Sequence, residues 1–81
     1  KKLELLWLND TPVGDPGIAA LVRISSLREL DLRGTKVSDR SLRGLSQMTG
    51  LDVLRLENTR YTATGIGRLK QALRNCQVSG P

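Results

Sequence analysis

Histidine and phenylalanine are both absent from this chain, and tryptophan, tyrosine and cysteine each occur once in its 81 residues. Without histidine, the chain lacks the commonest general base and a common metal ligand. The single cysteine, Cys76, excludes an internal disulfide framework and a multi-cysteine zinc site. We therefore expect no catalytic residues, no metal and no cofactor, and we do not expect an enzyme.

Long apolar runs are also missing, since none approaches the ~18 residues that a transmembrane helix needs. The first residues, Lys1 to Glu4, are not typical of a signal peptide, because the apolar stretch there is short and charged. A chain of this length has room for one small domain, so we expect a single domain over residues 1–81. One free cysteine favours a reducing compartment, which makes the cytoplasm the expected location.

A 24-residue spacing organises the residues that are present. Leu3, Leu27 and Leu51 are separated by this interval, and six further positions repeat with it and are always apolar. A period between 20 and 50 residues is the mark of a stacked array of repeats. The further columns are Leu6/Leu30/Leu54, Leu8/Leu32/Leu56, Val13/Val37/Tyr61, Ile18/Leu42/Ile66, Leu21/Leu45/Leu69 and Ile24/Met48/Ala72.

Each repeat begins as a strand and continues as a helix. The alternation around Leu30 and Leu32 predicts a short half-buried strand, and the apolar spacing later in each repeat predicts a short helix. Asp15 and Asp39 stand at the expected helix starts, where a carboxylate can accept hydrogen bonds from first-turn N–H groups. The third repeat has Ala63 there, which leaves Thr62 or Thr64 to cap that helix.

These residues resemble the leucine-rich repeat family. The pattern is Leu27-xx-Leu30-x-Leu32-xx-Thr35-x-Val37-x-Asp39-x-Ser41-Leu42, and it recurs in register from Leu3 to about Val78. The resemblance implies an α/β solenoid with three parallel strands on the concave face and short helices on the convex face. The repeats would span residues 3–26, 27–50 and 51–74, followed by a closing segment over 75–81. The stretch 69–78 resembles the final helix and closing strand of bacterial threonine-type members.

Threonine replaces the family's usual asparagine at the ninth position, as Thr11, Thr35 and Thr59. We expect these threonines to form a column that satisfies backbone groups where the chain leaves each strand. After residue 74 the register is expected to fail, because Asn75 stands where a leucine is due. Either Val78 keeps its column or Cys76 fills an apolar position after a one-residue insertion. In both cases Cys76 is expected to pack rather than to react.

The outward strand positions form three rows, in which we place the candidate binding residues. Trp7 is the most informative of them, because tryptophan is enriched in binding hot spots. The alternative is that Trp7 shields the open end of the stack. We expect surface ion pairs between Asp31 and Arg55 and between Arg33 and Glu57. The full set is Leu5, Trp7, Glu29, Asp31, Arg33, Val53, Arg55 and Glu57.

The pattern favours a non-catalytic scaffold that binds a protein partner through the concave strand face. One alternative is nucleic-acid or anionic-surface binding through a basic convex face. The net charge of +5 and the lack of interleaved aromatics count against it. Another is a regulatory or targeting module of a larger enzyme. The basic residues in question are Lys1, Lys2, Arg23, Arg40, Arg43, Arg60, Arg68, Lys70 and Arg74.

The first strand has no polar segment to cover Leu3, Leu6 and Leu8. Repeat arrays need such caps for solubility. We therefore expect this chain to be a fragment of a longer protein. Self-association through the exposed N-terminal end is a further hypothesis.

Overall fold

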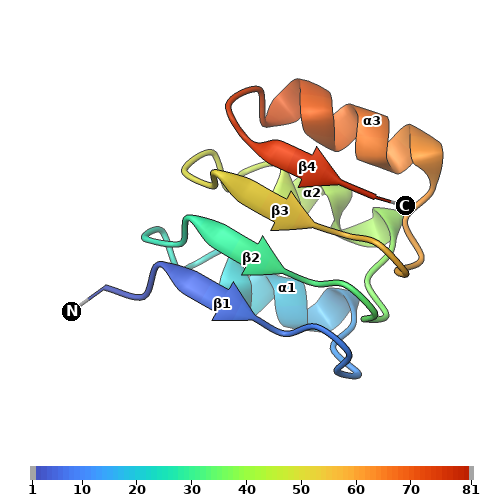
Figure 1. The fold of residues 1–81 in the computed structure, drawn as a ribbon, viewed down its shortest axis with the longest axis horizontal. Coiled ribbons are helices and arrows are strands. Elements are labelled where there is room, and N and C mark those ends of the chain that lie inside the picture. Colours follow the sequence, from blue (N-terminus) through green and yellow to red (C-terminus); the bar gives the residue numbers. More distant parts are fainter. Residues whose placement is uncertain (1, 81) are drawn as a thin grey trace.

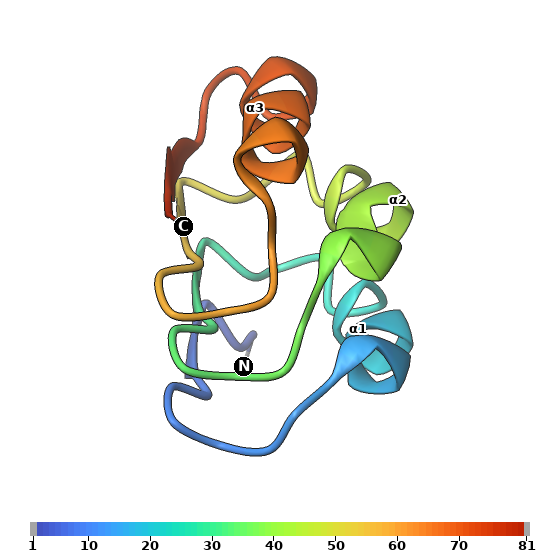
Figure 2. The same cartoon turned by 90° about the vertical axis from the view of Figure 1, so that its right-hand side faces the viewer.

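Four short parallel strands form one of the two layers in the computed structural model, which describes residues 2–80 (Figure 1). They are β1 (Leu5–Trp7), β2 (Glu29–Asp31), β3 (Val53–Arg55) and β4 (Gln77–Ser79), and they lie in the sheet in chain order. The second layer holds α1 (Asp15–Leu21), a 3₁₀ turn η1 (Asp39–Ser41), α2 (Leu42–Leu45) and α3 (Ala63–Ala72). Figure 2 shows all the helices on one side of the sheet. None of the described helices combines the length and the apolarity needed to cross a membrane.

Each strand pairs with the next at an offset of one repeat. Leu6 lies beside Leu30, Leu30 beside Leu54, and Leu54 beside Val78. The predicted alignment of equivalent leucines on neighbouring parallel strands is therefore confirmed for these columns.

The prediction of three strands was wrong, because the closing segment, which resembles a closing strand in the sequence, forms a fourth strand, β4. Of the two alternatives for its register, the one in which Val78 keeps its column is confirmed. Gln77 N donates to Asp52 O at 2.8 Å, and Leu56 N donates to Ser79 O at 2.8 Å. These bonds satisfy backbone groups that would otherwise stay unpaired at the edge of β3. Pairing with the edge of β3 therefore holds β4 in register, even though Asn75 departs from the leucine pattern.

The core lies between the two layers and is mainly aliphatic. The sheet contributes Leu30, Leu54 and Val78, and the helices contribute residues such as Ile18 and Leu69. The expected inward position of Ala72 was wrong, because Ala72 is exposed and Leu73 is buried instead. The third helix, α3, has 10 residues, whereas α1 has 7. At the end of the longer helix, Leu73 rather than Ala72 faces the core.

The threonine column behaves as predicted. Thr11, Thr35 and Thr59 each donate a side-chain hydrogen bond to the carbonyl three residues earlier, at 2.6, 2.7 and 2.7 Å. The residue before each threonine has a positive φ: 61° at Asp10, 72° at Gly34 and 58° at Asn58. Glycine, asparagine and aspartate are the residues that best tolerate this conformation. Every repeat therefore leaves its strand through the same turn.

Asp15 and Asp39 do not cap their own helices, which corrects the prediction from sequence. The Asp15 carboxylate accepts from Ser38 N at 2.8 Å and from Ser38 Oγ at 2.6 Å, one repeat further along. Asp39 binds Thr62 in the same way, at 2.9 and 2.6 Å. The N-cap positions are the residues just before, namely Gly14, Ser38 and Thr62. Thr62 Oγ1 accepts from Gly65 N at 3.0 Å, which confirms one of the two predicted caps of the third helix. The aspartates thus join neighbouring repeats.

Candidate functional site: the strand face

We define the strand face as the side of the sheet that points away from the helices. Strand pairing places Leu5, Glu29 and Val53 in one row and Trp7, Asp31 and Arg55 in the next. The sequence analysis missed the fourth member of each row, because the rows were counted over the three repeats and not extended to the closing segment. These members are Gln77 and Ser79, and an offset of 24 from Val53 and Arg55 would have found them. The carboxyl ends of the strands add Asn9, Arg33 and Glu57.

Apolar side chains are concentrated at the β1 end of this face. Trp7 is 66% exposed and Leu5 is 48% exposed, while Val53 on β3 is partly buried. A tryptophan this exposed can bury a large area against a partner, and this buried area is the main source of the binding energy of an aromatic side chain. The face therefore has an apolar end at β1 and a polar remainder.

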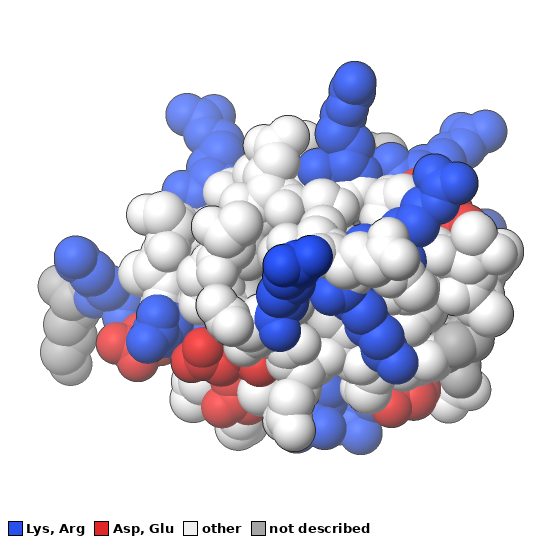
Figure 3. Space-filling model, turned by 90° about the horizontal axis from the view of Figure 1, so that it is seen from above, with Lys and Arg blue, Asp and Glu red and all other residues white. Residues whose placement is uncertain are grey.

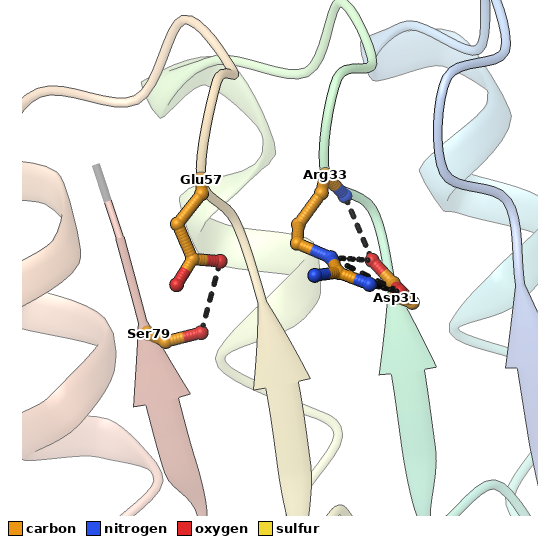
Figure 4. A network of polar contacts seen from close by, with 4 residues as sticks. All are labelled: Asp31, Arg33, Glu57 and Ser79. Atoms are coloured by element: carbon orange, nitrogen blue, oxygen red, sulfur yellow. Dashed lines mark hydrogen bonds and ion pairs between the residues drawn. The ribbon is translucent and has the colours of Figure 1, made fainter.

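The predicted ion pair between Asp31 and Arg55 does not form. Asp31 is only 6% exposed, and Arg33 from the end of the same strand takes its carboxylate in a two-pronged contact (Figure 4). Arg33 Nη2 donates to Asp31 Oδ2 at 2.7 Å, and Nε donates to Oδ1 at 3.0 Å. These hydrogen bonds hold the pKa of Asp31 below its usual value, and Arg55 adds a weaker electrostatic attraction. Asp31 pairs with Arg33 rather than with Arg55, because Arg33 reaches both carboxylate oxygens in the fork geometry that arginine and carboxylate favour.

The predicted pair between Arg33 and Glu57 does not form either, because Asp31 already occupies Arg33. Glu57 instead accepts a hydrogen bond from Ser79 Oγ at 3.1 Å (Figure 4). This contact joins the end of β3 to β4. Two of the acidic groups on the face are thus used within the protein.

Arg55 and Glu29 are the charged side chains of the face that remain open to a partner. Within residues 2–80 the ion pairs are Arg28 with Asp52 and Arg33 with Asp31, so neither Arg55 nor Glu29 is engaged in one. Arg55 is exposed on β3, and Glu29 is partly buried on β2. Over the same residues, no three Asp, Glu, Cys or His side chains gather as a metal site would require.

The last third of the chain carries an excess of positive charge. From Asn58 to Pro81 the sequence has no Asp or Glu, but it has Arg60, Arg68, Lys70 and Arg74. Figure 3 looks onto the α3 and β4 end, where Lys and Arg side chains project on several sides and most of the acidic groups in view lie along the lower border. Of the basic residues singled out from the sequence, Lys1 lies outside the described residues.

Cys76 packs against the core beneath the end of α3. It is partly buried, and burial raises the pKa of its thiol to about 11, with Asp52 contributing in the same direction. Such a thiol holds little thiolate at neutral pH, so it is a poor nucleophile. The environment of Cys76 therefore agrees with a packing role.

Comparison with known proteins found no matching family model, no matching curated protein and no matching solved structure. The function proposed below therefore rests on the residues of this chain.

Proposed function

We propose that the chain is a leucine-rich-repeat solenoid that binds a protein partner through its strand face and carries out no catalysis. The identical offset at all three strand pairings supports the repeat assignment. The recurring threonine and positive-φ turns support it as well. Solenoids of this kind offer extended surfaces for binding.

The observation that carries the binding proposal is the exposure of Trp7 beside Leu5. The apolar and polar parts of the face indicate which chemical groups the partner would present. An apolar group would cover Trp7 and Leu5, and a carboxylate would meet Arg55 two strands away, at about 10 Å. Glu29 on β2 lies between these two anchors and Val53 lies on the same strand as Arg55, while Asp31 and Glu57 help to fix the polar side chains around them.

Site-specific photo-crosslinking tests this proposal. A photoreactive amino acid at position 53 would report on the strand face, and one at position 71 on the exposed side of α3 would serve as the matched control. We expect a protein to be captured from position 53 and not from position 71. Capture from position 71 alone would contradict binding through the strand face.

Affinity for the captured protein then tests the named residues. We expect Trp7→Ala to weaken binding by ~2 kcal/mol or more, which is the scale of a hot spot. Arg55→Glu should also weaken it and leaves the β1 edge untouched, whereas Gln71→Ala should leave the dissociation constant unchanged within about twofold. Unchanged affinity in both strand-face variants would refute the proposed site.

A second candidate function is binding of a nucleic acid through the basic helix side. The absence of acidic residues after Glu57 favours it. Its test is fluorescence anisotropy with a labelled oligonucleotide at increasing salt, compared with the variant Arg68→Glu/Lys70→Glu/Arg74→Glu. Binding near physiological salt that the triple variant abolishes would support this candidate, and binding only at low salt would not.

A further inference from the structure

A groove runs along the helix side of the molecule between α1 and α2, which lie side by side (Figure 2). It consists of two hollows, of about 280 and 110 Å³, and Gln47 borders both of them. We define the α1–α2 groove by Ile18, Val22 and Gly44 between the helices and by Gln47 where the two hollows meet. Because the groove lies between the first and second repeats, both of its walls belong to the described residues.

Gly44 leaves room in one wall of the groove because it has no side chain. A Cβ at this position would meet Ile18 Cγ2 and Val22 Cγ2 at 3.4 Å, so Gly44 faces α1 directly. At an offset of 24 residues, the same column holds Ala20 in the first repeat and Arg68 in the third. The missing side chain is therefore particular to the middle repeat.

The floor of the groove is apolar. Ile18 and Met48 are nearly buried, at 2 and 7% exposure, while Val22 and Ile24 are partly buried and form part of the surface of the smaller hollow. Each hollow is smaller than the ~300–1,000 Å³ of a typical small-molecule site. Individual apolar side chains of a peptide therefore fit this groove better than an enclosed small molecule does.

The larger hollow is positively charged at its border. Arg40 and Arg43 stand there, both are exposed, and neither forms an ion pair within residues 2–80. Asp15 is the acidic residue that lines this hollow, but Ser38 and Ser41 already hold its carboxylate, and Arg40 is the smallest cause of its lowered pKa. The two guanidinium groups are therefore open to a carboxylate from outside the chain, which arginine binds in a fork geometry.

We propose that the α1–α2 groove binds an acidic segment of a protein partner. A carboxylate of that segment is held by Arg40 and Arg43, and a large apolar side chain is seated in the smaller hollow against Val22 and Ile24. Among the described residues that line the groove none is aromatic, so a nucleic acid would find no side chain on which to stack its bases. Charge and lining together therefore favour a peptide as the occupant.

Selection from a phage-displayed library of random peptides of about 12 residues tests the class of ligand. The target is the variant Trp7→Ala/Arg55→Glu, in which the strand face is disabled at two exposed positions, so the result does not depend on the proposed function. We expect the enriched peptides to combine paired acidic residues with a large apolar residue. No enrichment, or enrichment of peptides without acidic residues, would overturn the proposal.

Affinity for a fluorescently labelled copy of the selected peptide tests the charged border. At about 0.15 M salt, where distant charges are screened, we expect Arg40→Ala/Arg43→Ala to raise the dissociation constant at least about tenfold. The matched control, Lys70→Ala/Arg74→Ala, removes the same charge from the end of α3 and should change it less than about twofold. All four side chains are exposed, so circular dichroism should stay unchanged. Equal losses in the two double variants would indicate attraction to net charge alone and would overturn the proposal.

A charge placed on the groove wall tests the location of the peptide. Ala19 is exposed on α1 and borders the larger hollow, so Ala19→Glu should weaken peptide binding at least about fivefold, whereas Ala19→Lys should not weaken it. In nitrogen-15-labelled protein, the amide signals of Gly44 and Gln47 should shift when the peptide is added. Equal weakening by the two Ala19 variants, or amide shifts confined to residues outside the groove, would overturn the proposal.

Discussion

Asp15 binds both the backbone N–H and the hydroxyl of Ser38, the residue that begins the next helical segment of the array. The same carboxylate also accepts from the hydroxyl of Ser41. Because Asp39 repeats this contact with Thr62, two carboxylates join three successive repeats. The contacts fix the spacing of the helix layer, as the strand hydrogen bonds fix the spacing of the sheet.

Replacing Asp15 by Asn should destabilise the protein. Hydrogen bonds to a charged group contribute about 1.5–3 kcal/mol each, and the neutral amide keeps only part of that contribution. We expect a loss of ~1–2 kcal/mol in the free energy of unfolding, measured by urea denaturation. The matched control is Asp52→Asn, whose ion pair with Arg28 is more than half exposed, and we expect a change below about 0.5 kcal/mol there. Equal effects of the two variants would contradict the joining role of Asp15.

The contribution of Asp15 should depend on pH. Burial works to raise its pKa, but the hydrogen bonds from Ser38 and Ser41 outweigh burial, and the net pKa lies below the ordinary value. A depressed folded-state pKa stabilises the fold above the unfolded pKa of ~3.9, and this stabilisation is lost as pH falls through the folded value. The difference in unfolding free energy between the wild type and Asp15→Asn should therefore be full at pH 7 and shrink at about pH 3. A difference that stays constant over this range would contradict the ionised contact.

Two glycines should respond in opposite ways to alanine. Gly34 has a φ of 72°, and a Cβ there would meet the side chain of Asp10 from the neighbouring repeat, so Gly34→Ala should cost at least ~1–2 kcal/mol. Gly67 lies on the exposed side of α3, where an added Cβ would have no neighbour within 4 Å, so Gly67→Ala should gain ~0.5–1 kcal/mol. Thermal unfolding measures both changes. Adding Asp10→Gly, which removes the side chain and suits the positive φ at position 10, to Gly34→Ala should recover part of the loss, and no recovery would contradict the contact with Asp10.

Equivalent leucines should differ in their importance along the stack. Leu54 is fully buried between β2 and β4, so Leu54→Ala should destabilise the fold by about 2–5 kcal/mol. Leu6 occupies the same column on β1 but is only partly buried, and we expect less than half of that loss from Leu6→Ala. Urea unfolding compares the two variants. Equal losses would contradict the difference in burial between Leu6 and Leu54.

The parallel strand pairing could be predicted from sequence because one interval governs every apolar column. Leu6, Leu30 and Leu54 needed only a common offset to share the interior. The partners of the charged groups could not be predicted in this way. Asp31 binds Arg33 because the chain turns just after β2 and brings that side chain back, a geometry that row-by-row counting does not contain.

The register of the closing strand and the role of the aspartates could not be predicted for a related reason. Residues 77–79 lack the leucine pattern, and their strand forms because β3 offers them unpaired backbone groups. Asp15 was assigned to its own helix start because capping rules are local, whereas Ser38 reaches it from the next repeat. The strand-face residues themselves were placed together correctly, since their rows follow the pairing of the strands.

The direction of the aspartate contacts decides how this protein can be lengthened. The first repeat has Gly14 where a hydroxyl would be needed, and the third has Ala63 where a carboxylate would be needed. Residues 27–50 contain both halves of the contact, Ser38 and Asp39. An inserted duplicate of this middle unit would find a matching neighbour on each side, so extension of the array by whole units requires no new chemistry at either junction.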